Sequence, residues 1–292
     1  MNALVDRLRD RTFWTSVAPG FHIEDRASFA RVPLWELPAP AETIAAVLDR
    51  EGYVHLPGAQ GAAAAQQLSS AVRRLVDAGL PPVFAMVFDE FWIPAFALTK
   101  IVATALGGTY KLLPDFWIWH IDPAKDEAGW APHRDKGHRA LFPDGRPKAV
   151  TAWLALSDAD PLNGCMYLVP AHRDPHYGTE RDGDWTFAYP DVRALPAAVG
   201  DVFVWNQAVL HWGAHASPMA KAARVSMAFE FQREDVAPFN EPLIPATTIL
   251  RFEDRLKLIA KQVLQYKHMY RVPPDMDEAA RTLVGAGGDG RR

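Results

Sequence analysis

The chain has a single cysteine, Cys165, among its 292 residues. One cysteine excludes an intramolecular disulfide and any zinc or iron–sulfur site that needs several thiolates. Cations are not in excess either, because 31 Lys and Arg face 35 Asp and Glu, for a net charge of −4. General binding to nucleic acids or anionic membranes depends on clustered Lys and Arg, so neither partner is expected.

Long apolar runs are also missing. The N-terminal stretch mixes Asp6 and Arg9 into its apolar residues, so it lacks the apolar region of a secretory signal. The longest apolar segment, 83–106, is interrupted by charges such as Asp89 and Lys100, which are costly in a bilayer. We therefore expect a cytoplasmic protein, with residues 83–106 forming buried helix and turn.

Several familiar enzyme motifs are absent or misplaced. Gly285, Gly287 and Gly290 match the dinucleotide-binding spacing, but no strand precedes them and no helix follows. The segment 133–135 resembles the catalytic loop of protein kinases, yet the Asp-Phe-Gly and nucleotide-lysine motifs are missing. No G-x-S-x-G segment supports a serine hydrolase. A kinase is therefore excluded, the dinucleotide-binding match carries no weight, and a serine hydrolase is unsupported.

Helical spacing dominates the first hundred residues. The apolar face of 44–48 ends at Gly52, and that of 68–76 ends at Gly79, with a strand-like segment at 53–56 between them. After residue 250, apolar residues return at spacings of four and three, which predicts another helix.

From residue 110 to about 231 the pattern changes to short apolar or alternating runs separated by Pro, Gly and Asp. This texture is typical of a β-sandwich or barrel. The expected strands are 116–120, 149–156, 166–169, 201–205, 209–212 and 224–231. With no Gly/Ser linker and no repeats, we expect one domain over 1–285 and a disordered tail at 286–292.

A histidine and a carboxylate two residues apart point the same way from an extended strand. Joined by a second histidine, they form the two-histidine, one-carboxylate set that binds non-haem Fe(II) and leaves one face of the metal open. Such pairs also arise by chance. The chain has three: His133/Asp135, His120/Asp122 and His172/Asp174.

His211 is the candidate third ligand, because a double-stranded β-helix brings an early strand against a late one. It lies near the end of an apolar predicted strand, 76 residues after Asp135, and His215 four residues later is its competitor. Arg224 follows His211 by 13 residues, with Ser226 on the same strand face. A guanidinium beside a hydroxyl is suited to hold a carboxylate.

Three segments make the chain resemble the phytanoyl-CoA dioxygenase family of Fe(II)- and 2-oxoglutarate-dependent oxygenases over residues 40–235. Residues 51–58 (EGYVHLPG) resemble the early Gly-aromatic-Val-x-Leu-Pro-Gly strand of that family. Residues 133–172 are similar to its central run, in which a Trp-x-x-Leu strand leads to Asn-Gly-Cys. Residues 200–213 resemble the strand that carries the distal ligand.

The resemblance implies an α+β fold with a mainly β core, a double-stranded β-helix (jelly roll) flanked by N-terminal and C-terminal helices. It also implies that the two other His-x-Asp pairs are structural or lie behind the ligands. The implied site residues are His133, Asp135 and His211 as catalytic Fe(II) ligands, with Arg224, Ser226 and Trp153 for 2-oxoglutarate.

The implied activity is oxidation of a small organic molecule or natural-product intermediate by O2, most simply hydroxylation, with release of succinate and CO2. Related halogenases have a small residue in place of the carboxylate ligand, so Asp135 favours hydroxylation, desaturation or ring formation. Two alternatives stay open: a non-catalytic metal- or small-molecule-binding jelly roll, and a zinc-dependent hydrolase with the same ligands.

The sequence does not specify the substrate or the oligomeric state. Trp119, Trp130 and Trp212 are candidates for an aromatic pocket wall, although core positions are favoured for each. The basic residues between 134 and 148 are interpreted as part of a solvated loop.

Overall fold

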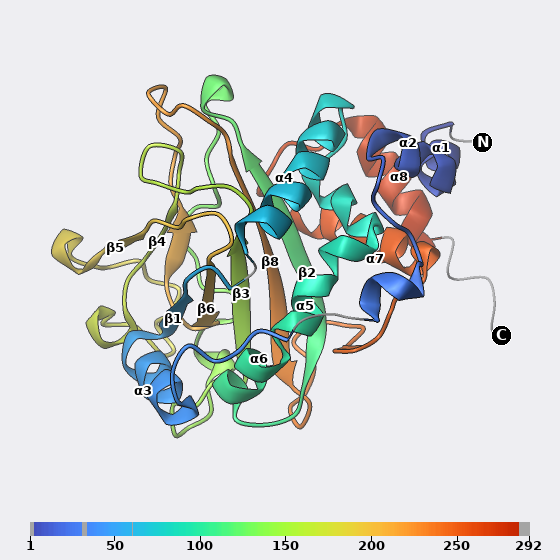
Figure 1. Ribbon diagram of the computed structural model, residues 1–292. Helices are drawn as coiled ribbons and strands as arrows, with labels where there is room; N and C mark the ends of the chain where they lie inside the picture. The colour runs from blue at the N-terminus through green and yellow to red at the C-terminus, as the bar shows by residue number, and fades with distance from the viewer. Residues whose placement is uncertain (1–2, 31–33, 60, 286–292) are drawn as a thin grey trace.

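Two antiparallel sheets form the centre of the protein (Figure 1). The computed structural model describes residues 3–30, 34–59 and 61–285. The strands in these ranges are β1 (Tyr53–Leu56), β2 (Tyr110–Ile121), β3 (Ala149–Ala155), β4 (Met166–Leu168), β5 (Arg193–Leu195), β6 (Val202–Asn206), β7 (His211–Gly213), β8 (Arg224–Arg233) and β9 (Ile244–Pro245). The larger sheet has the order β1-β6-β3-β8-β2-β9 and the smaller one β5-β4-β7. This arrangement fits the expected double-stranded β-helix.

Strand β8 is central to the larger sheet, because it pairs with β2 on one side and β3 on the other. Its odd-numbered residues from Val225 to Phe231 belong to the main apolar core. The alternate residues Arg224, Ser226, Ala228 and Glu230 point to the opposite face, between the two sheets, where Ala228 packs with Trp153 and Phe203 in a second core cluster. Both faces are buried, so the polar residues of β8 lie inside the protein.

Helices cover the outer face of the larger sheet and the end of the molecule where the two termini lie (Figure 1). The α-helices are α1 (Ala3–Arg9), α2 (Arg11–Val17), α3 (Ala41–Glu51), α4 (Ala62–Asp77), α5 (Ile93–Ala97), α6 (Thr99–Leu106), α7 (Phe252–Tyr266) and α8 (Pro274–Gly285). Short 3₁₀ helices lie between α-helices or between strands: η1 (Arg26–Phe29), η2 (Pro82–Val87), η3 (Asp89–Phe91), η4 (Pro123–Lys125), η5 (Gly137–Ala140), η6 (Ala171–Arg173) and η7 (Tyr189–Asp191).

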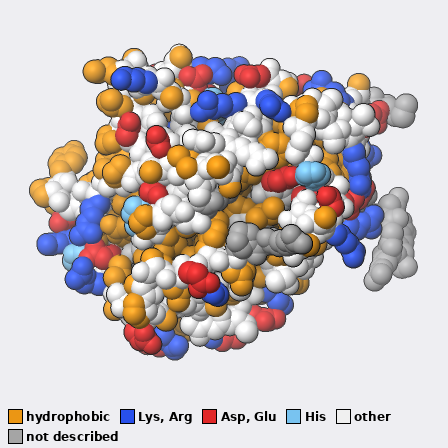
Figure 2. Space-filling view, viewed as in Figure 1, with side chains coloured by type: hydrophobic (Ala, Val, Ile, Leu, Met, Phe, Trp, Pro, Cys, Tyr) orange, Lys and Arg blue, Asp and Glu red, His pale blue; other side chains and the backbone are white. Residues whose placement is uncertain are grey.

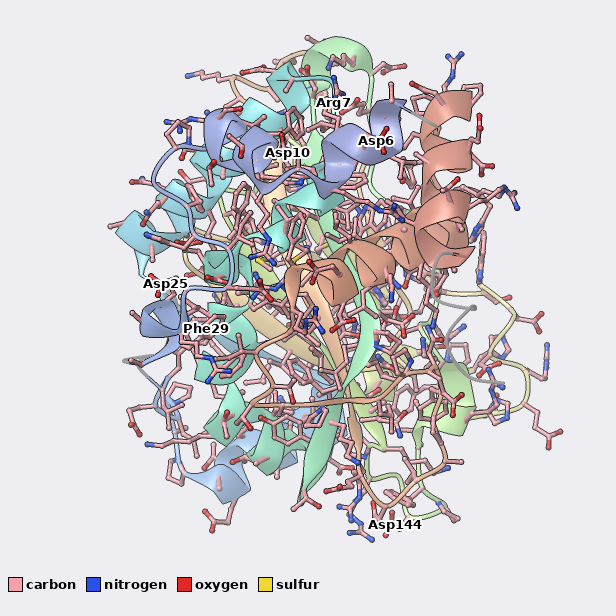
Figure 3. The ribbon with its side chains drawn as sticks, turned by 90° about the vertical axis from the view of Figure 1, so that its right-hand side faces the viewer. Asp6, Arg7, Asp10, Asp25, Phe29 and Asp144 are labelled. Carbon is pink, nitrogen blue, oxygen red and sulfur yellow. The ribbon has the colours of Figure 1, made fainter. Side chains whose placement is uncertain are left out.

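The N-terminal helices pack beside the C-terminal ones, as Figure 3 shows for α1 against α8. Two aspartates labelled there begin helices: Asp10 accepts the Thr12 amide at 2.8 Å and Asp25 accepts the Ala27 amide at 2.9 Å. Such side-chain caps satisfy amides that have no partner within the helix. Polar capping residues therefore mark the starts of α2 and η1.

The predicted helix end at Gly52 has a steric reason. Gly52 caps α3 with φ +78°, a conformation that favours glycine. A Cβ atom there would also lie 2.3 Å from Val209 Cγ2. The chain can therefore turn directly from α3 into β1 at this position only because the residue has no side chain.

Most expected elements are present, with several differences. Helices α1, α2 and α8 and strands β5 and β9 were not anticipated. Strand β2 begins at Tyr110 rather than at 116, and β7 begins at His211 rather than at 209. Residues 133–135 do not form a strand, since His133 makes a single bridge to His211. The tail expected at 286–292 lies outside the described residues, and the single domain over 1–285 stays a prediction.

The expectation for 83–106 is confirmed, because η2, η3, α5 and α6 occupy this segment. None of the helices in the described ranges is long and apolar enough to span a membrane. On the face seen in Figure 2, acidic and basic side chains are interspersed.

Candidate metal centre

Three side chains meet between the sheets as a possible metal site. His211 begins β7, and its backbone exchanges two hydrogen bonds of 3.0 Å with the backbone of His133. Asp135 Oδ1 lies 3.5 Å from His133 Nε2 and 3.6 Å from His211 Nε2. The ligand atoms of all three residues lie within 4.8 Å of one another, so the group can hold one metal ion. The sequence therefore predicted this cluster, although residues 133–135 do not form the expected strand.

The backbone orients both imidazole rings. His133 Nδ1 lies 2.7 Å from the Ala131 carbonyl oxygen, and His211 Nδ1 lies 3.0 Å from that of Val209. A carbonyl only accepts, so each Nδ1 carries the hydrogen and each Nε2 presents its lone pair to the cluster. This is the arrangement in which metal-binding histidines are usually held.

Asp135 is held in a similar way. Its Oδ2 accepts hydrogen bonds from Thr151 Oγ1 at 2.7 Å and from Trp205 Nε1 at 3.3 Å. Gln207 Nε2 in turn donates to Thr151 Oγ1 at 3.2 Å and to a Glu230 oxygen at 2.8 Å. Oδ1 is thus left to face the two histidines.

Burial and the neighbouring charges set the protonation of the cluster. Burial lowers the pKa of His211 to about 4. Burial alone raises the pKa of Asp135, but the two histidines and the Thr151 hydroxyl outweigh it and hold that pKa below its usual range. Burial also opposes the charge on His133, whereas Asp135 raises its pKa overall. An ionised Asp135 beside a neutral His211 is the form in which both residues bind a divalent cation.

Arg224 is buried, and no carboxylate of the described residues forms an ion pair with it. It is 1% exposed, its Nη1 donates to Ser226 Oγ at 2.6 Å, and its Nε has no partner among the described residues. Its guanidinium lies 5.9 Å from the Trp153 ring centre, and burial lowers the pKa of Arg224 to about 10. A buried charge left unpaired costs several kcal/mol, roughly 3–5 when a partner is removed. The arrangement is therefore suited to a bound anion.

One cavity joins the metal cluster to Arg224. Its wall includes the three candidate ligands together with Arg224 and Trp153. Trp153 Nε1 is buried and has no hydrogen-bond partner among the described residues. An indole N–H only donates, so it adds a second unused donor beside the guanidinium.

The structure separates the predicted site residues from their competitors. His133, Asp135, His211, Arg224 and Trp153 all line the cavity, while fully buried Ser226 lies behind Arg224 and accepts its hydrogen bond. His215 is outside the cluster, with 58% of its side chain exposed and its Nε2 3.7 Å from Asp126.

The other two His-x-Asp pairs lie elsewhere. Asp122 accepts the Ala124 amide at 3.0 Å and begins η4. Asp174 binds Arg134, the residue between two of the candidate ligands, at 2.5 Å. His172 is paired with the Arg50 carbonyl at 3.1 Å.

Two sequence interpretations of nearby residues need correction. Arg134 and Lys136 are not solvated, since their side chains are 3% and 14% exposed and Lys136 Nζ lies 3.0 Å from Glu230. Of the three tryptophans weighed for a pocket wall, Trp119 and Trp130 line the cavity. Trp212 instead stacks on neighbouring aromatic rings at 5.5 and 5.9 Å.

The sequence did not point to four other residues of the cavity wall: Asp115, Thr151, Glu230 and Tyr266. Glu230 could have been found, because it shares the β8 face of Arg224. Thr151 lies two residues before Trp153 and so shares its face. Asp115 and Tyr266 carried no comparable signal. Asp115 lies in an irregular part of β2 between Leu112 and Phe116, and Tyr266 is brought to the cavity by the packing of α7 against β2.

The comparison with protein families gives a match that includes the candidate metal ligands. The model of the phytanoyl-CoA dioxygenase family matches residues 86–223. This range holds all three candidate metal ligands and ends one residue before Arg224. The comparison with curated proteins found no match.

Solved structures share the fold. The epimerase SnoN, in complex with Fe3+, α-ketoglutarate and nogalamycin RO, is 21% identical with a TM-score of 0.54, covering 73% of this chain and 97% of its own. HygX from Streptomyces hygroscopicus, with nickel and 2-oxoglutarate, is 17% identical with a TM-score of 0.53, covering 70% and 91%. The non-heme monooxygenase ThoJ is 16% identical with a TM-score of 0.55, covering 83% and 99%. The predicted double-stranded β-helix is confirmed.

Proposed function

We propose that the chain is an Fe(II)- and 2-oxoglutarate-dependent oxygenase of the phytanoyl-CoA dioxygenase family, acting on a small organic molecule. The observation that carries the proposal is Arg224, which lines the same cavity as the metal cluster. Its buried guanidinium has no anionic partner in the part of the chain that the structure describes. A cosubstrate with a free carboxylate supplies that partner. Solved structures of this fold contain the same cosubstrate.

In this proposal His133, Asp135 and His211 hold Fe(II), since two imidazoles and a carboxylate suit this ion and leave positions free for other ligands. Arg224, positioned by Ser226, binds the far carboxylate of 2-oxoglutarate, and Trp153 flanks it and offers Nε1–H. When bound, Fe(II) and 2-oxoglutarate supply the activation of O2, with succinate and CO2 as coproducts.

The reaction outcome is proposed as hydroxylation. A carboxylate at position 135, held by Thr151 and Trp205, argues against halogenation, because a halide needs the space of that ligand. Solved structures of this fold carry names as different as epimerase, carbocyclase and monooxygenase. Hydroxylation is the simplest outcome that the retained carboxylate permits, and a natural-product intermediate fits the substrates of such enzymes.

Two alternatives use the same fold. A non-catalytic metal- or small-molecule-binding jelly roll and a zinc-dependent hydrolase both keep the three ligands. Neither requires the metal cluster and the uncompensated charge of Arg224 to share one cavity. We therefore favour the oxygenase.

The test is to add Fe(II) and 2-oxoglutarate without O2 and to record the weak visible metal-to-ligand charge-transfer band. We expect the band with the unchanged protein. Arg224→Leu should weaken 2-oxoglutarate binding by about 10- to 100-fold, the value of a charge-assisted hydrogen-bond pair. Lys221→Ala removes a nearby exposed charge and should leave the titration unchanged.

Folded protein that gives no band contradicts the oxygenase. Succinate formation coupled to O2 uptake separates the oxygenase from the hydrolase, since hydrolysis consumes no O2. Substrate candidates are ranked by how far they stimulate that coupled turnover.

A further inference from the structure

A wall of aromatic rings continues the cavity away from Arg224. It consists of Trp117, Trp119, Trp130 and Tyr266, all of which line the cavity, and we call it the aromatic wall. Neighbouring ring centres are 4.5 Å apart for Trp130 and Tyr266 and 5.0 Å for Trp119 and Trp130. The Trp130 ring is also 5.9 Å from the imidazole of His133. The aromatic wall therefore reaches the metal cluster.

Two buried carboxylates line the cavity beside this wall. Asp115 is 0% exposed and Glu230 is 8% exposed. Asp115 is fully engaged, with hydrogen bonds of 2.8 and 2.9 Å from Asn240 and of 2.6 Å from Gln265. Glu230 is different, because both of its contacts are made by Oε2, with Lys136 at 3.0 Å and Gln207 at 2.8 Å. Its Oε1 has no partner among the described residues.

The two carboxylates of Asp115 and Glu230 share a single neighbouring ammonium group among the described residues. One ammonium, Lys136, lies 3.0 Å from Glu230 and 4.0 Å from Asp115, so it serves two carboxylates. Lys261 lies nearby but bonds Asn240 and the Glu241 carbonyl rather than a carboxylate. Burial raises the pKa of Glu230 to about 8, with Asp115 and Asp135 adding to the effect against Lys136. An added positive charge would keep Glu230 ionised.

From this geometry we propose that the substrate carries a cationic nitrogen, an ammonium or substituted amine, bound between Glu230 Oε1 and the aromatic wall. Ring faces attract cations, and a carboxylate oxygen accepts the N–H hydrogen bonds of an amine. The nitrogen end is then fixed beside the metal cluster, while Arg224 at the other end of the same β8 face stays free for a carboxylate. That this cation belongs to an oxidised substrate rests on the proposed function.

The test compares cations with uncharged molecules of the same shape. Calorimetric titrations use cyclohexylamine against cyclohexanol, and choline against 3,3-dimethylbutan-1-ol. They are run on the metal-free protein and on protein with Fe(II) and 2-oxoglutarate under anaerobic conditions. We expect each cation to bind at least about tenfold tighter than its neutral partner, because only the cation gains from the ring faces and from the carboxylate.

Glu230→Gln keeps the shape and removes the charge, so it should reduce that preference to less than about threefold. The matched control is Glu234→Gln, a half-exposed glutamate paired with Lys111 on the surface, which should keep the preference. Trp130→Leu should weaken cation binding more than binding of the neutral partner. It tests the site independently if the Glu230 variant does not fold.

The proposal is overturned if each cation binds no tighter than its neutral partner. It is also overturned if a folded Glu230→Gln protein still prefers the cations to the same degree. The outcome is separable from the proposed function. If the charge-transfer band forms but cations are not preferred, only the proposed substrate class is wrong. If cations are preferred but no band forms, the binding site is supported and the oxygenase proposal is wrong.

Discussion

The hydrogen bonds behind Asp135 have a fixed direction. The carboxylate only accepts, so the Thr151 hydroxyl donates to it and must itself accept from Gln207. Gln207 gives its second amide hydrogen to Glu230. A short relay of side chains therefore connects the candidate substrate-binding carboxylate to the metal ligand, and Thr151 is its link to Asp135.

Replacing Thr151 by valine should weaken the metal site while keeping the fold. The variant is nearly isosteric and removes the 2.7 Å bond to Asp135. Loss of such a partner behind a ligand typically lowers metal affinity about 10- to 100-fold. Titration with Zn(II) or Co(II) measures the change, and Thr151→Ser, which keeps the hydroxyl, should recover most of it. Equal affinities for the valine variant and the unchanged protein would show that Asp135 needs no such support.

At the scale of elements, β7 and the loop before His133 touch backbone to backbone. A Cβ atom built on Gly129 would lie 2.5 Å from Gly213 Cα, and one on Gly213 would lie 2.7 Å from Gly129 Cα. The Gly213 amide donates to the Trp130 carbonyl at 3.0 Å. Two glycines thus let the strand that carries His211 approach the loop that carries His133.

Gly129→Ala should push these two segments apart. Overpacking at a close contact typically costs about 1–3 kcal/mol of the free energy of unfolding. Metal affinity should fall with it, because the two histidines come from the two displaced segments. Denaturant unfolding and metal titration measure the two effects. Gly183→Ala is the control, since a Cβ atom there meets nothing within 4 Å, and a similar loss in that variant would contradict the steric explanation.

Spacing predicted the elements that have a clear period and missed those without one. The alternation at 224–231 predicted β8 and the face of Arg224 correctly, because every second residue is apolar and lies in the main core. Strand β5 is three residues long and largely exposed, so it carries no apolar pattern. Helix α8 begins at Pro274 with buried residues at helical spacing, a start signal that was present and was not used. The bridge between His133 and His211 is a tertiary contact, which local pattern does not encode.

Across the whole molecule, one buried ion pair ties distant parts of the chain together. Arg255 of α7 lies 2.6 Å from Asp89, and both side chains are 0% exposed. Asp89 also accepts the amides of Glu24 and Asp25 at 3.0 and 2.8 Å, and Arg255 donates to the Val87 carbonyl at 2.9 Å. N-terminal, central and C-terminal segments therefore share one network.

Asp89→Asn should destabilise the protein by about 3–5 kcal/mol, because it leaves the Arg255 charge buried and unpaired. Changing both residues, Asp89→Asn with Arg255→Met, should recover part of the loss. Denaturant unfolding followed by fluorescence and by circular dichroism measures it. If residues 1–285 form one domain, both signals should change in a single transition; two separate transitions would contradict that prediction.

Arg134 stands between the candidate ligands His133 and Asp135, but its side chain binds a neighbouring loop rather than the metal cluster. Arg134 binds Asp174 and also reaches the Asp182 and Asp184 carbonyls, while the same loop holds His138 through Asp182 at 2.8 Å. Along residues 133–135, the first and third side chains face the metal cluster, and the middle one faces the loop. Coupling between two such events is reciprocal. If a molecule that contacts the loop tightens metal binding, the metal must tighten the binding of that molecule by the same factor.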